Sequence, residues 1–494
     1  MWSDRSGRGP VPCMWAALIC VSLVCGCNLV LPLSGGPDGA SGPPGDGVTA
    51  GDGVTAGDGI VAVDGGDVVP SWSRVFGGSS DDQGLGVAVD GQGNVTVTGF
   101  FQNSMDLGGA KLTSAGAPDV FLVTFDAGGS LVRQDRFGGS STEKGTAVAT
   151  DAAGNVTMTG SMNGSVDFGG GPLPDSGDLF VVRFDASGKH VWSKAIDGSM
   201  ATYAARTVAL APDGNAIVGG SFMKTVKLGD VTLPDSGGFV ASYGPDGALV
   251  WARPLGSAPI NGCNAVAVAG SGNVAVVGTF YGTMDLGDDT LTSAGTNDLF
   301  VASLDAGGAP RWARRIEVPD QLNEAHGVAI DPDGHTVVTG CFTETADFEG
   351  SAKLTSQGGQ DVFVARYDPN GNLDWALRGG GPKHDLGWAV AVDPAGNIVV
   401  TGSFRETADF GGKTLDLGGD NDEIFVASYT KGGAHRWSYG FGGASTDRGE
   451  AVAVDAKGNV AVTGTVRGTV DFGQGPHDIG QFGDIFVLWL AAQP

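Results

Sequence analysis

Cysteine is scarce in this chain of 494 residues, and its placement excludes a scaffold built on disulfides. Six cysteines are present, and only Cys263 and Cys341 lie after residue 27. Basic residues are also few, because 28 lysines and arginines stand against 55 acidic residues and leave a formal net charge of −27 at pH 7. A field of this sign repels nucleic acid, so we expect no nucleic-acid partner.

Long apolar runs are missing as well. The longest candidate, Trp15–Val24, is too short to span a bilayer as a helix. It follows Arg5 and Arg8, which is the arrangement of a secretory signal peptide, and we predict such a peptide over residues 1–26. Any stable contact with a membrane must then come from a covalent anchor.

The residues that end this run, VCGC, resemble the lipobox of bacterial lipoproteins, in which small residues precede a lipid-modified cysteine. Cys27 fits that cysteine best. The resemblance implies an outer-membrane lipoprotein of the bacterial cell envelope, facing the periplasm or the cell surface and touching the membrane through its lipid alone. An ordinary secretory signal peptide is the alternative, and the protein would then be secreted.

Aromatic residues, leucine, lysine and arginine are all absent from residues 45–60, which read GDGVTAGDGVTAGDGI. A segment rich in glycine, proline and aspartate cannot bury enough apolar surface to fold. We therefore predict that residues 27–71 form a disordered tether between the lipid anchor and a folded domain. The chain holds 87 glycines, but they show no three-residue period, which excludes collagen.

A repeat of about 60 residues fills the chain from residue 72 to residue 494. Each copy contains four short strand patterns, one after a tryptophan and then patterns such as AVAVD, NVTVTG and DVFVARYD. Seven copies of four antiparallel strands predict an all-β, seven-bladed β-propeller over 72–494. The tryptophan position recurs at Trp72, Arg133, Trp192, Trp251, Trp312, Trp375 and Trp437.

Between the second and third patterns stands D-x-x-G-N, as in DPAGN at 393–397. Glycine supplies the positive φ of a tight hairpin, while aspartate and asparagine bond to the backbone of the turn. These acids are too few and too closely spaced for a calcium-binding loop. We interpret them as turn residues.

The stretch 361–404, DVFVARYDPNGNLDWALRGGGPKHDLGWAVAVDPAGNIVVTGSF, resembles the SBBP-type β-propeller repeat family. The matching pattern is D-x-FVA-x-YD-x-x-G-x-x-x-W followed by G-x-AVAVD-x-x-GN-x-VVTG, and the resemblance extends over 72–494. It implies the propeller fold, but the family is defined by its repeat and not by one shared activity. Three positions depart from the pattern: Arg133 at the tryptophan, His335 at the turn asparagine and Gly238 at the aspartate.

We name the strands of one blade a (AVAVD), b (NVTVTG), c (DVFVARYD) and d (the tryptophan strand), with d outermost. The first copy begins with a d strand alone, and the last copy ends on a c strand. The N-terminal strand over residues 72–78 should therefore complete the last blade beside residues 484–490, which removes the open edge of the ring. The periodic tryptophans should pack between blades.

The d–a and b–c connections emerge on one face of the predicted ring, and short a–b and c–d turns emerge on the other. Long, variable segments such as 77–86 and 317–326 belong to the first face. Function concentrates on variable loops held by a rigid scaffold. We therefore predict that the face of the d–a and b–c connections carries the binding surface.

An acidic motif of the form T-x-D-F-G recurs in the b–c segment of six copies, and Lys227 replaces the acid in the third copy. Six carboxylates on one face could bind cations, with calcium as the candidate cofactor, or a basic partner. Alternatively, each acid accepts hydrogen bonds from its local backbone. The acids are Asp106, Asp167, Asp285, Asp347, Asp409 and Asp471.

A second motif, S-x-[DE]-x-G, recurs in three d–a loops with its acids at Asp82, Glu143 and Asp447. It partly resembles the Asp-box of sialidase-like propellers, but the trailing aromatic residue is absent, and capping of a turn explains it better. Cys263 and Cys341 should lie on the same face in neighbouring blades. A disulfide between them is one prediction, and a pair of buried free thiols is the other.

No catalytic constellation stands out, because the six histidines are scattered and form neither H-x-x-H nor H-E-x-x-H. A P-loop, a Rossmann fingerprint and a G-x-S-x-G elbow are also missing. We predict a monomeric, non-enzymatic binding or scaffolding module for a protein or glycan at the cell envelope. An exported polysaccharide hydrolase or lyase, with acidic residues and histidine of the loop face as acid and base, is the alternative.

Overall fold

The protein folds as strands and turns within the compact unit Thr55–Pro494. The predicted signal peptide, Cys27 and most of the predicted tether lie outside the residues that the structure describes. The described part of the chain contains no helix that is long and apolar enough to cross a membrane. The computed structural model describes residues 61–63, 70–108, 111–175, 178–197, 206–233, 236–256, 262–287, 289–295, 297–319, 323–443 and 445–493.

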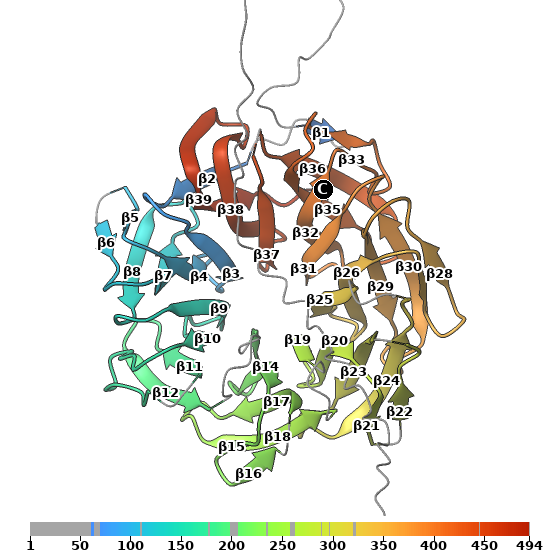
Figure 1. The fold of residues 1–494 in the computed structure, drawn as a ribbon, viewed down its shortest axis with the longest axis horizontal. Helices are drawn as coiled ribbons and strands as arrows, with labels where there is room; N and C mark the ends of the chain where they lie inside the picture. The colour runs from blue at the N-terminus through green and yellow to red at the C-terminus, as the bar shows by residue number, and fades with distance from the viewer. Residues whose placement is uncertain are drawn as a thin grey trace, which may run out of the picture. The chain divides into compact units, whose positions relative to one another are not determined.

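Seven antiparallel sheets follow one another around a ring, and each contains the four strands of one blade (Figure 1). Strand a of each blade is innermost and lies against strand a of both neighbouring blades. This arrangement confirms the predicted all-β, seven-bladed propeller.

Blades 1 to 7 are numbered by their a strands: β3 (Gln83–Val89), β9 (Glu143–Thr150), β13 (Thr207–Leu210), β19 (Gly262–Val268), β25 (Glu324–Ile330), β31 (Leu386–Val392) and β37 (Arg448–Val454). Their b strands, in the same order, are β4 (Val95–Phe101), β10 (Val156–Met162), β14 (Ala216–Phe222), β20 (Val274–Phe280), β26 (Thr336–Phe342), β32 (Ile398–Arg405) and β38 (Val460–Asp471).

The c strands are β7 (Asp119–Phe125), β11 (Leu179–Phe184), β17 (Gly237–Tyr243), β23 (Asp298–Leu304), β29 (Asp361–Tyr367), β35 (Asp422–Tyr429) and β39 (Pro476–Leu490). The outer d strands are β8 (Leu131–Phe137), β12 (His190–Ile196), β18 (Leu249–Leu255), β24 (Pro310–Ile316), β30 (Leu373–Gly379), β36 (His435–Phe441) and, in blade 7, β2 (Trp72–Phe76). Most of the residues in strands b and c are buried, because each of these strands lies between two other strands of its blade and between two neighbouring blades.

The D-x-x-G-N turns close the a–b hairpins as predicted. In blade 1 the backbone N–H of Asn94 donates to Asp90 Oδ1 at 2.9 Å, and Asn94 Nδ2 donates to Oδ2 at 2.7 Å. Gly93 between them has a φ of +84°. His335, which departs from the repeat, preserves the turn because its own backbone N–H donates to Asp331 Oδ1 at 2.9 Å.

The first d strand and the last c strand close the ring, as predicted. Strand β2 pairs antiparallel with β39, from Trp72 opposite Trp489 to Phe76 opposite Ile485. In Figure 1, the blue strand β2 lies beside the red strands β38 and β39. Blade 7 is therefore assembled from both ends of the repeat region.

One strand falls inside the range that we assigned to the tether. Val61–Val63 form β1, which pairs antiparallel with the outer strand β36 of blade 6, so that Ala62 lies opposite Tyr439 (Figure 1). The flanking residues 51–60 and 64–69 lie outside the described residues. Three residues are too few to show an alternating pattern, which is why the sequence did not indicate this strand.

The periodic tryptophans pack between blades, as predicted. Trp312 of blade 4 donates its indole N–H to the carbonyl oxygen of Pro369 in blade 5 at 3.1 Å. The ring also covers Gly371, where a Cβ would lie 2.6 Å from it and where φ is +82°. Arg133 preserves this contact by donating to the carbonyl oxygen of Gly188 at 2.9 Å. Equivalent bonds to the next blade are made by Trp72, Trp192, Trp251 and Trp375.

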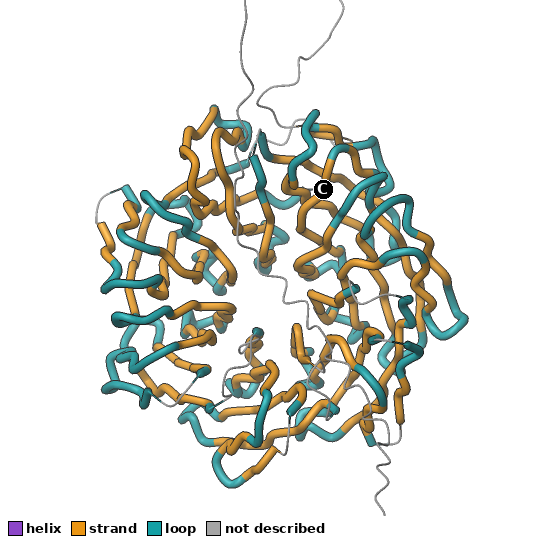
Figure 2. The backbone as a smooth tube through the Cα atoms, in the orientation of Figure 1, coloured by secondary structure: helices purple, strands orange, loops and turns teal. Residues whose placement is uncertain are grey.

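Most of the b–c segments fold into small hairpins, which the sequence analysis did not predict. In blade 7 the hairpin is continuous with β38 and β39. Figure 2 colours these short strands orange and the connections that remain between them teal. Five hairpins are separate two-stranded sheets: β5 (Ser104–Asp106) with β6 (Lys111–Thr113), β15 (Val226–Leu228) with β16 (Val231–Leu233), β21 (Thr283–Leu286) with β22 (Asp289–Thr292), β27 (Thr345–Asp347) with β28 (Lys353–Thr355), and β33 (Thr407–Ala408) with β34 (Leu415–Asp416).

These hairpins also reach the preceding blade. The backbones of Glu317 in blade 4 and Asp347 in blade 5 exchange two hydrogen bonds of 2.9 Å each. Gly380 in blade 5 and Asp409 in blade 6 exchange two bonds of 3.0 Å. A similar bridge joins blade 7 to blade 1. The b–c segments are thus structural links between blades as well as surface connections.

Candidate functional site

The six aspartates of the T-x-D-F-G motif lie one to a blade in the b–c hairpins, and the structure does not gather them into a cluster. Asp409 Oδ1, for example, accepts the backbone N–H of Gly411 at 2.7 Å. No group of three or more His, Cys, Asp or Glu side chains that could hold a metal ion occurs among the described residues. Asp285 is exposed on β21. Such local backbone bonds, which were the structural alternative for this motif, are made by Asp106, Asp167, Asp347, Asp409 and Asp471.

The acids of the S-x-[DE]-x-G motif are completely buried. Glu143 caps its own loop, because its Oε2 accepts the N–H of Gly139 at 2.9 Å. Asp82 Oδ1 instead accepts the N–H of Gln102 at 2.8 Å, at the end of strand b in the same blade, and Asp447 makes the equivalent bond. Capping was expected, whereas the link to the b strand was not.

Cys263 and Cys341 are free thiols, and both are buried. The structure therefore shows the second of the two predicted alternatives. Gln360 Nε2 donates to the sulfur of Cys341 at 3.2 Å, and His326 Nε2 lies 3.9 Å from it. Burial raises the pKa of Cys341 to about 12 and also raises the pKa of Cys263. Neither thiol is a reactive nucleophile near neutral pH.

A candidate site that our sequence analysis missed lies on the inner strands. In six blades, strand a shifts register against strand b, and one residue bulges from the ladder at the same position each time. β-Bulges redirect side chains and are frequent beside functional sites. Arg206 occupies this position in blade 3, directly before β13. We call the seven residues the bulge ring: Leu85, Thr146, Arg206, Asn264, His326, Trp388 and Glu450.

The bulge ring lies near the start of each a strand, toward the face that carries the d–a and b–c connections. All seven of its residues are partly exposed, whereas the strands behind them are almost entirely buried. The ring therefore places seven partly exposed residues around the axis of the propeller, on the face that we predicted to carry the binding surface, although only 9% of the His326 side chain is exposed.

Neighbouring members of the bulge ring contact one another across blade boundaries. Arg206 Nη1 donates to Asn264 Oδ1 at 2.9 Å, and Asn264 Nδ2 donates to the carbonyl oxygen of Ala325 at 2.9 Å. The rings of His326 and Trp388 lie 4.3 Å apart, centroid to centroid, at an angle of 38°. These contacts join the side chains of blades 3 to 6 into one continuous surface.

Burial sets the protonation of two groups in the bulge ring. It lowers the pKa of His326, so the imidazole is neutral at pH 7, and it raises the pKa of Glu450. Glu324 Oε2 lies 3.6 Å from His326 Nδ1. With Arg206 and Trp388, the surface offers a guanidinium, an amide, a neutral imidazole, an indole and a carboxyl group. Such a set of polar groups beside an aromatic ring can orient a polar ligand.

The signal that could have revealed this ring is the residue immediately before the AVAVD pattern. The pattern itself hardly changes between copies, but the residue before it changes in size, charge and aromatic character from copy to copy. A comparison of repeat copies reveals the residues that they share, whereas this position is recognised by the residues that differ.

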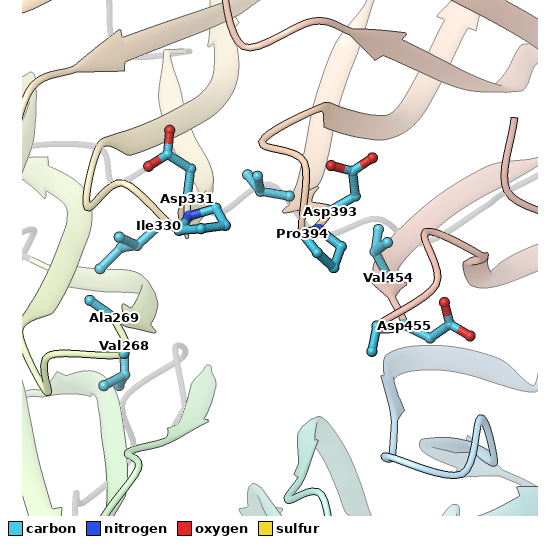
Figure 3. Close-up of a pocket in the computed structure, with 12 residues that line it drawn as sticks. Val268, Ala269, Ile330, Asp331, Asp393, Pro394, Val454 and Asp455 are labelled. Atoms are coloured by element: carbon cyan, nitrogen blue, oxygen red, sulfur yellow. The ribbon is translucent and has the colours of Figure 1, made fainter. Parts of the chain in front are cut away.

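A hollow of about 330 Å³ lies on the opposite face, where the a–b turns of blades 4 to 7 approach one another. Figure 3 shows Asp331, Asp393 and Asp455 on three of these turns. Their carboxylates bond within the protein: Asp393 Oδ1 accepts the N–H of Asn397 at 2.8 Å, and Asp331 Oδ2 pairs with Arg366 at 2.7 Å. Because these groups already serve the turns, we place the candidate site at the bulge ring.

Comparison with known proteins finds relatives of low identity, and no protein-family model matches the chain. An uncharacterized WD repeat-containing protein of Acanthamoeba polyphaga mimivirus is 23% identical over 506 residues, which cover 81% of this chain and 36% of that protein. The regulatory protein FlaEY of Caulobacter vibrioides is 30% identical over 216 residues, which cover 42% of this chain and 20% of that protein. The chain thus spans about a third or less of the length of these curated relatives.

Solved structures similar to this chain include a virginiamycin B lyase from Staphylococcus aureus and the Pan2 WD40 domain of Neurospora crassa. The first has a TM-score of 0.44 and 6% identity, and covers 87% of this chain and 99% of that one. The second has a TM-score of 0.41 and 11% identity, and covers 84% and 97% respectively. At these values the likeness carries no argument about activity or ligand.

Proposed function

We propose that this protein is a non-enzymatic binding or scaffolding module of the bacterial cell envelope, and that it binds its ligand at the bulge ring. The observation that supports this proposal is the diversity of the ring on a scaffold that otherwise repeats. The bulge position holds a different residue in each blade. A position that differs in every blade has no packing role that the blades share, so its diversity fits the recognition of one asymmetric ligand.

A glycan is the ligand class that the bulge ring fits best, and a protein is the other candidate. The indole of Trp388 is partly exposed and has an apolar face on which a sugar ring can stack, while its N–H is buried. Arg206, Asn264 and Glu450 supply hydrogen-bond donors and acceptors that hydroxyl groups require. The contiguous surface of blades 3 to 6 places several of these groups side by side.

Export and anchoring are further parts of the proposal, with the protein acting as a monomer. The support for them is the apolar run within residues 1–26 and the lipobox-like VCGC that ends at Cys27. Membership of the SBBP-type repeat family is likewise a proposal, supported by the internal repeat over 72–494.

Isothermal titration calorimetry, which measures the dissociation constant for envelope oligosaccharides, tests the proposed site. A variant that combines Arg206→Ala, Trp388→Ala and Glu450→Gln should bind at least tenfold more weakly, equal to about 1.4 kcal/mol, because it removes the charged and aromatic contacts together. The control combines Asp333→Ala with Lys431→Ala, an exposed ion pair of 3.5 Å on the opposite face. The control should bind as the unaltered protein does.

Normal binding by the ring variant, with an unchanged melting temperature, would show that the site is wrong. Loss of binding in the control variant alone would move the site to the face of the a–b turns. Peptide ligands in the same titration decide between a glycan and a protein as the natural class.

An exported polysaccharide hydrolase or lyase is the second candidate, and one contact favours it. Glu324 lies 3.6 Å from His326 beside the bulge ring, and a carboxylate and an imidazole at that separation can act as base and acid. Cleavage of the oligosaccharide during titration, lost in Glu324→Gln, would support the enzyme and contradict the binding module.

A further inference from the structure

Four blade boundaries bury two carboxyl groups against each other. At each one, an acid of strand c in one blade meets the acid of the d–a segment that enters the next blade. All eight side chains are at most 9% exposed. We call these the carboxyl pairs: Asp484 with Asp82, Asp119 with Glu143, Asp361 with Asp385, and Glu423 with Asp447.

The backbone holds each carboxyl pair together. In every pair, the N–H of the d–a acid donates to the carbonyl oxygen of the residue before the c-strand acid, so the two acids are fixed across the boundary. The bonds run from Asp82 to Gly483, from Asp385 to Gln360 and from Asp447 to Asp422 at 2.7 Å each, and from Glu143 to Pro118 at 2.8 Å.

A glycine makes room for the carboxyl groups. At Gly442, where φ is +156°, a Cβ would lie 1.6 Å from Glu423 Oε2 and 3.1 Å from Asp447 Oδ2. This glycine is the first of the GG dipeptide that follows strand d, and GG recurs at the other three boundaries that hold a carboxyl pair. The first glycine of the dipeptide is therefore required because a side chain at this position would collide with the two acids.

In the two pairs that border blade 7, each acid has one buried carboxyl oxygen without a hydrogen-bond partner among the described residues, whereas Glu423 Oε2 accepts the N–H of Gly443 at 3.0 Å. Within the described residues, Asp82 Oδ2 and Asp484 Oδ1 are buried and unpartnered, and so are Glu423 Oε1 and Asp447 Oδ2. Two ionised carboxylates in this position would repel each other, and the backbone N–H groups of Gly78 and Gly443 offset only part of the cost of burying two charges. A single proton turns one of the two groups into a donor and replaces the repulsion with a hydrogen bond.

The boundary between blades 4 and 5 carries a neutral group at the same place. Asn323 replaces the d–a acid there and is completely buried. Its Oδ1 accepts the N–H of Thr343 at 2.6 Å, as Asp82 accepts the N–H of Gln102. An amide permanently carries the donor that a carboxyl group carries only when it is protonated. The repeat itself therefore contains the neutral counterpart of a protonated acid.

Arginines accompany two of the carboxyl pairs. Arg136 pairs with Asp119, and Arg378 pairs with Asp361 at 2.6 Å. The other two pairs, Asp484 with Asp82 and Glu423 with Asp447, have no ion-pair partner among the residues that the structure describes. Both of these pairs border blade 7, the blade that closes the ring.

We propose that the two carboxyl pairs bordering blade 7 each hold one proton between their carboxyl groups, and that loss of these protons above neutral pH loosens blade 7 from both neighbours. The proton leaves as the paired carboxyl group ionises, and the two carboxylates then repel each other in a buried position. Stability of the closed ring should therefore depend on pH through these two boundaries.

Burial is the main cause of the tight proton binding in these pairs. It raises the pKa of Asp82 and of Asp447 to about 7, of Asp484 to about 6 and of Glu423 to about 9. Carboxyl groups of an unfolded chain titrate near pH 4. The stability that these protons contribute is therefore complete below about pH 4 and is lost as the pH rises through about 6 to 9.

Other charged side chains near the two carboxyl pairs shift the pH range over which their protons are lost. The charge of Asp81 raises the pKa of Asp82, and that of Asp422 raises the pKa of Glu423. Asp422 is itself paired with Arg405 and Arg448. In the opposite direction, the charge of Arg467 lowers the pKa of Asp447.

Thermal unfolding between about pH 5 and about pH 9 tests the proposal. The melting temperature of the unaltered protein should fall as the pH rises. A variant with Asp82→Asn and Asp447→Asn copies Asn323 at both borders of blade 7, and it should lose about half or more of this fall. The control combines Asp175→Asn with Asp230→Asn, which removes two exposed carboxylates and should leave the fall unchanged.

The reverse change is Asn323→Asp, which creates a carboxyl pair with Asp298 between blades 4 and 5. It should lower the melting temperature more at about pH 9 than at about pH 5. If the double variant does not fold, the pH dependence of the melting temperature of Asn323→Asp still tests the proposal. Unchanged pH profiles in the Asn and Asp variants would overturn the proposal. Calcium that raises the melting temperature of the unaltered protein but not of the double variant would also overturn it, because a cation would then occupy the pairs.

Discussion

At the scale of the residue, Cys263 is explained by a partner in the preceding blade. At four boundaries a threonine of strand b faces a glycine of the next strand a, as Thr98 faces Gly145. Between blades 3 and 4 both positions are exchanged: Gly219 stands at the threonine position and Cys263 at the glycine position. A Cβ on Gly219 would lie 2.4 Å from the sulfur of Cys263. The thiol fills the volume that the missing threonine leaves, so Cys263 is a packing residue.

This exchange predicts a coupled pair of substitutions. Cys263→Gly should lower the free energy of unfolding by about 2 kcal/mol, because it leaves a buried space unfilled. Gly219→Thr alone should lower it by about 1–3 kcal/mol, because the new side chain meets the sulfur. The double variant should recover most of both losses, since it restores the pair that four other boundaries use. Urea unfolding of the two single variants and the double variant measures the coupling.

Two losses that simply add in the double variant would contradict this explanation, since independent sites are additive and contacting sites are not. Additive losses would also show that the Cys263 thiol does not fill the space left at Gly219.

At the scale of the element, the b–c hairpin combines two tasks in one short motif. The aspartate side chain bonds to the following turn, and the aspartate backbone bridges to the preceding blade, as Asp409 does with Gly411 and Gly380. The T-x-D-F-G pattern located the aspartates and gave the local bond as one of two alternatives. It did not show the hairpins or the bridges, because strands of two or three residues are shorter than the period that sequence patterns reveal.

The side-chain task predicts a modest and local loss of stability. Asp409→Ala should lower the free energy of unfolding by about 1 kcal/mol, because the N–H of Gly411 loses its acceptor. Lys227→Ala is the matched control, since a lysine at the same motif position offers no acceptor to a backbone N–H. Denaturant unfolding of both variants measures the difference. Equal losses in the two variants would show that the carboxylate bond does not stabilise the hairpin.

At the scale of the whole molecule, the sequence was sufficient for the main architecture of the repeat. The number of blades, the strand order, the D-x-x-G-N turns and the phase of closure all follow from rules that act within one copy. The carboxyl pairs depend instead on contacts between copies. Glu423 and Asp447 belong to different blades, and only the ring geometry makes them neighbours. A pattern read along one copy cannot show such a contact.

Closure by β2 predicts the effect of two truncations. Removal of residues 1–76 should lower the melting temperature and cause self-association, because β39 then presents an unpaired strand edge. Removal of residues 1–69 keeps β2, loses β1 as the one described strand in that range, and should give a monomer with a nearly unchanged melting temperature. Differential scanning calorimetry and size-exclusion chromatography measure both effects. A stable monomer after the longer truncation would contradict a closing role for β2.

The pairing of Trp72 with Trp489 also imposes an order in time on each new molecule. The first strand of the ring leaves the ribosome long before its partner exists, and at about 5–20 residues per second it waits roughly 20 to 80 s. During this interval six blades can form while the seventh consists of its outer strand β2 alone. A chain that stalls or is cleaved before β39 is made leaves β2 without a partner. Only a chain synthesised through β39 can therefore close the ring.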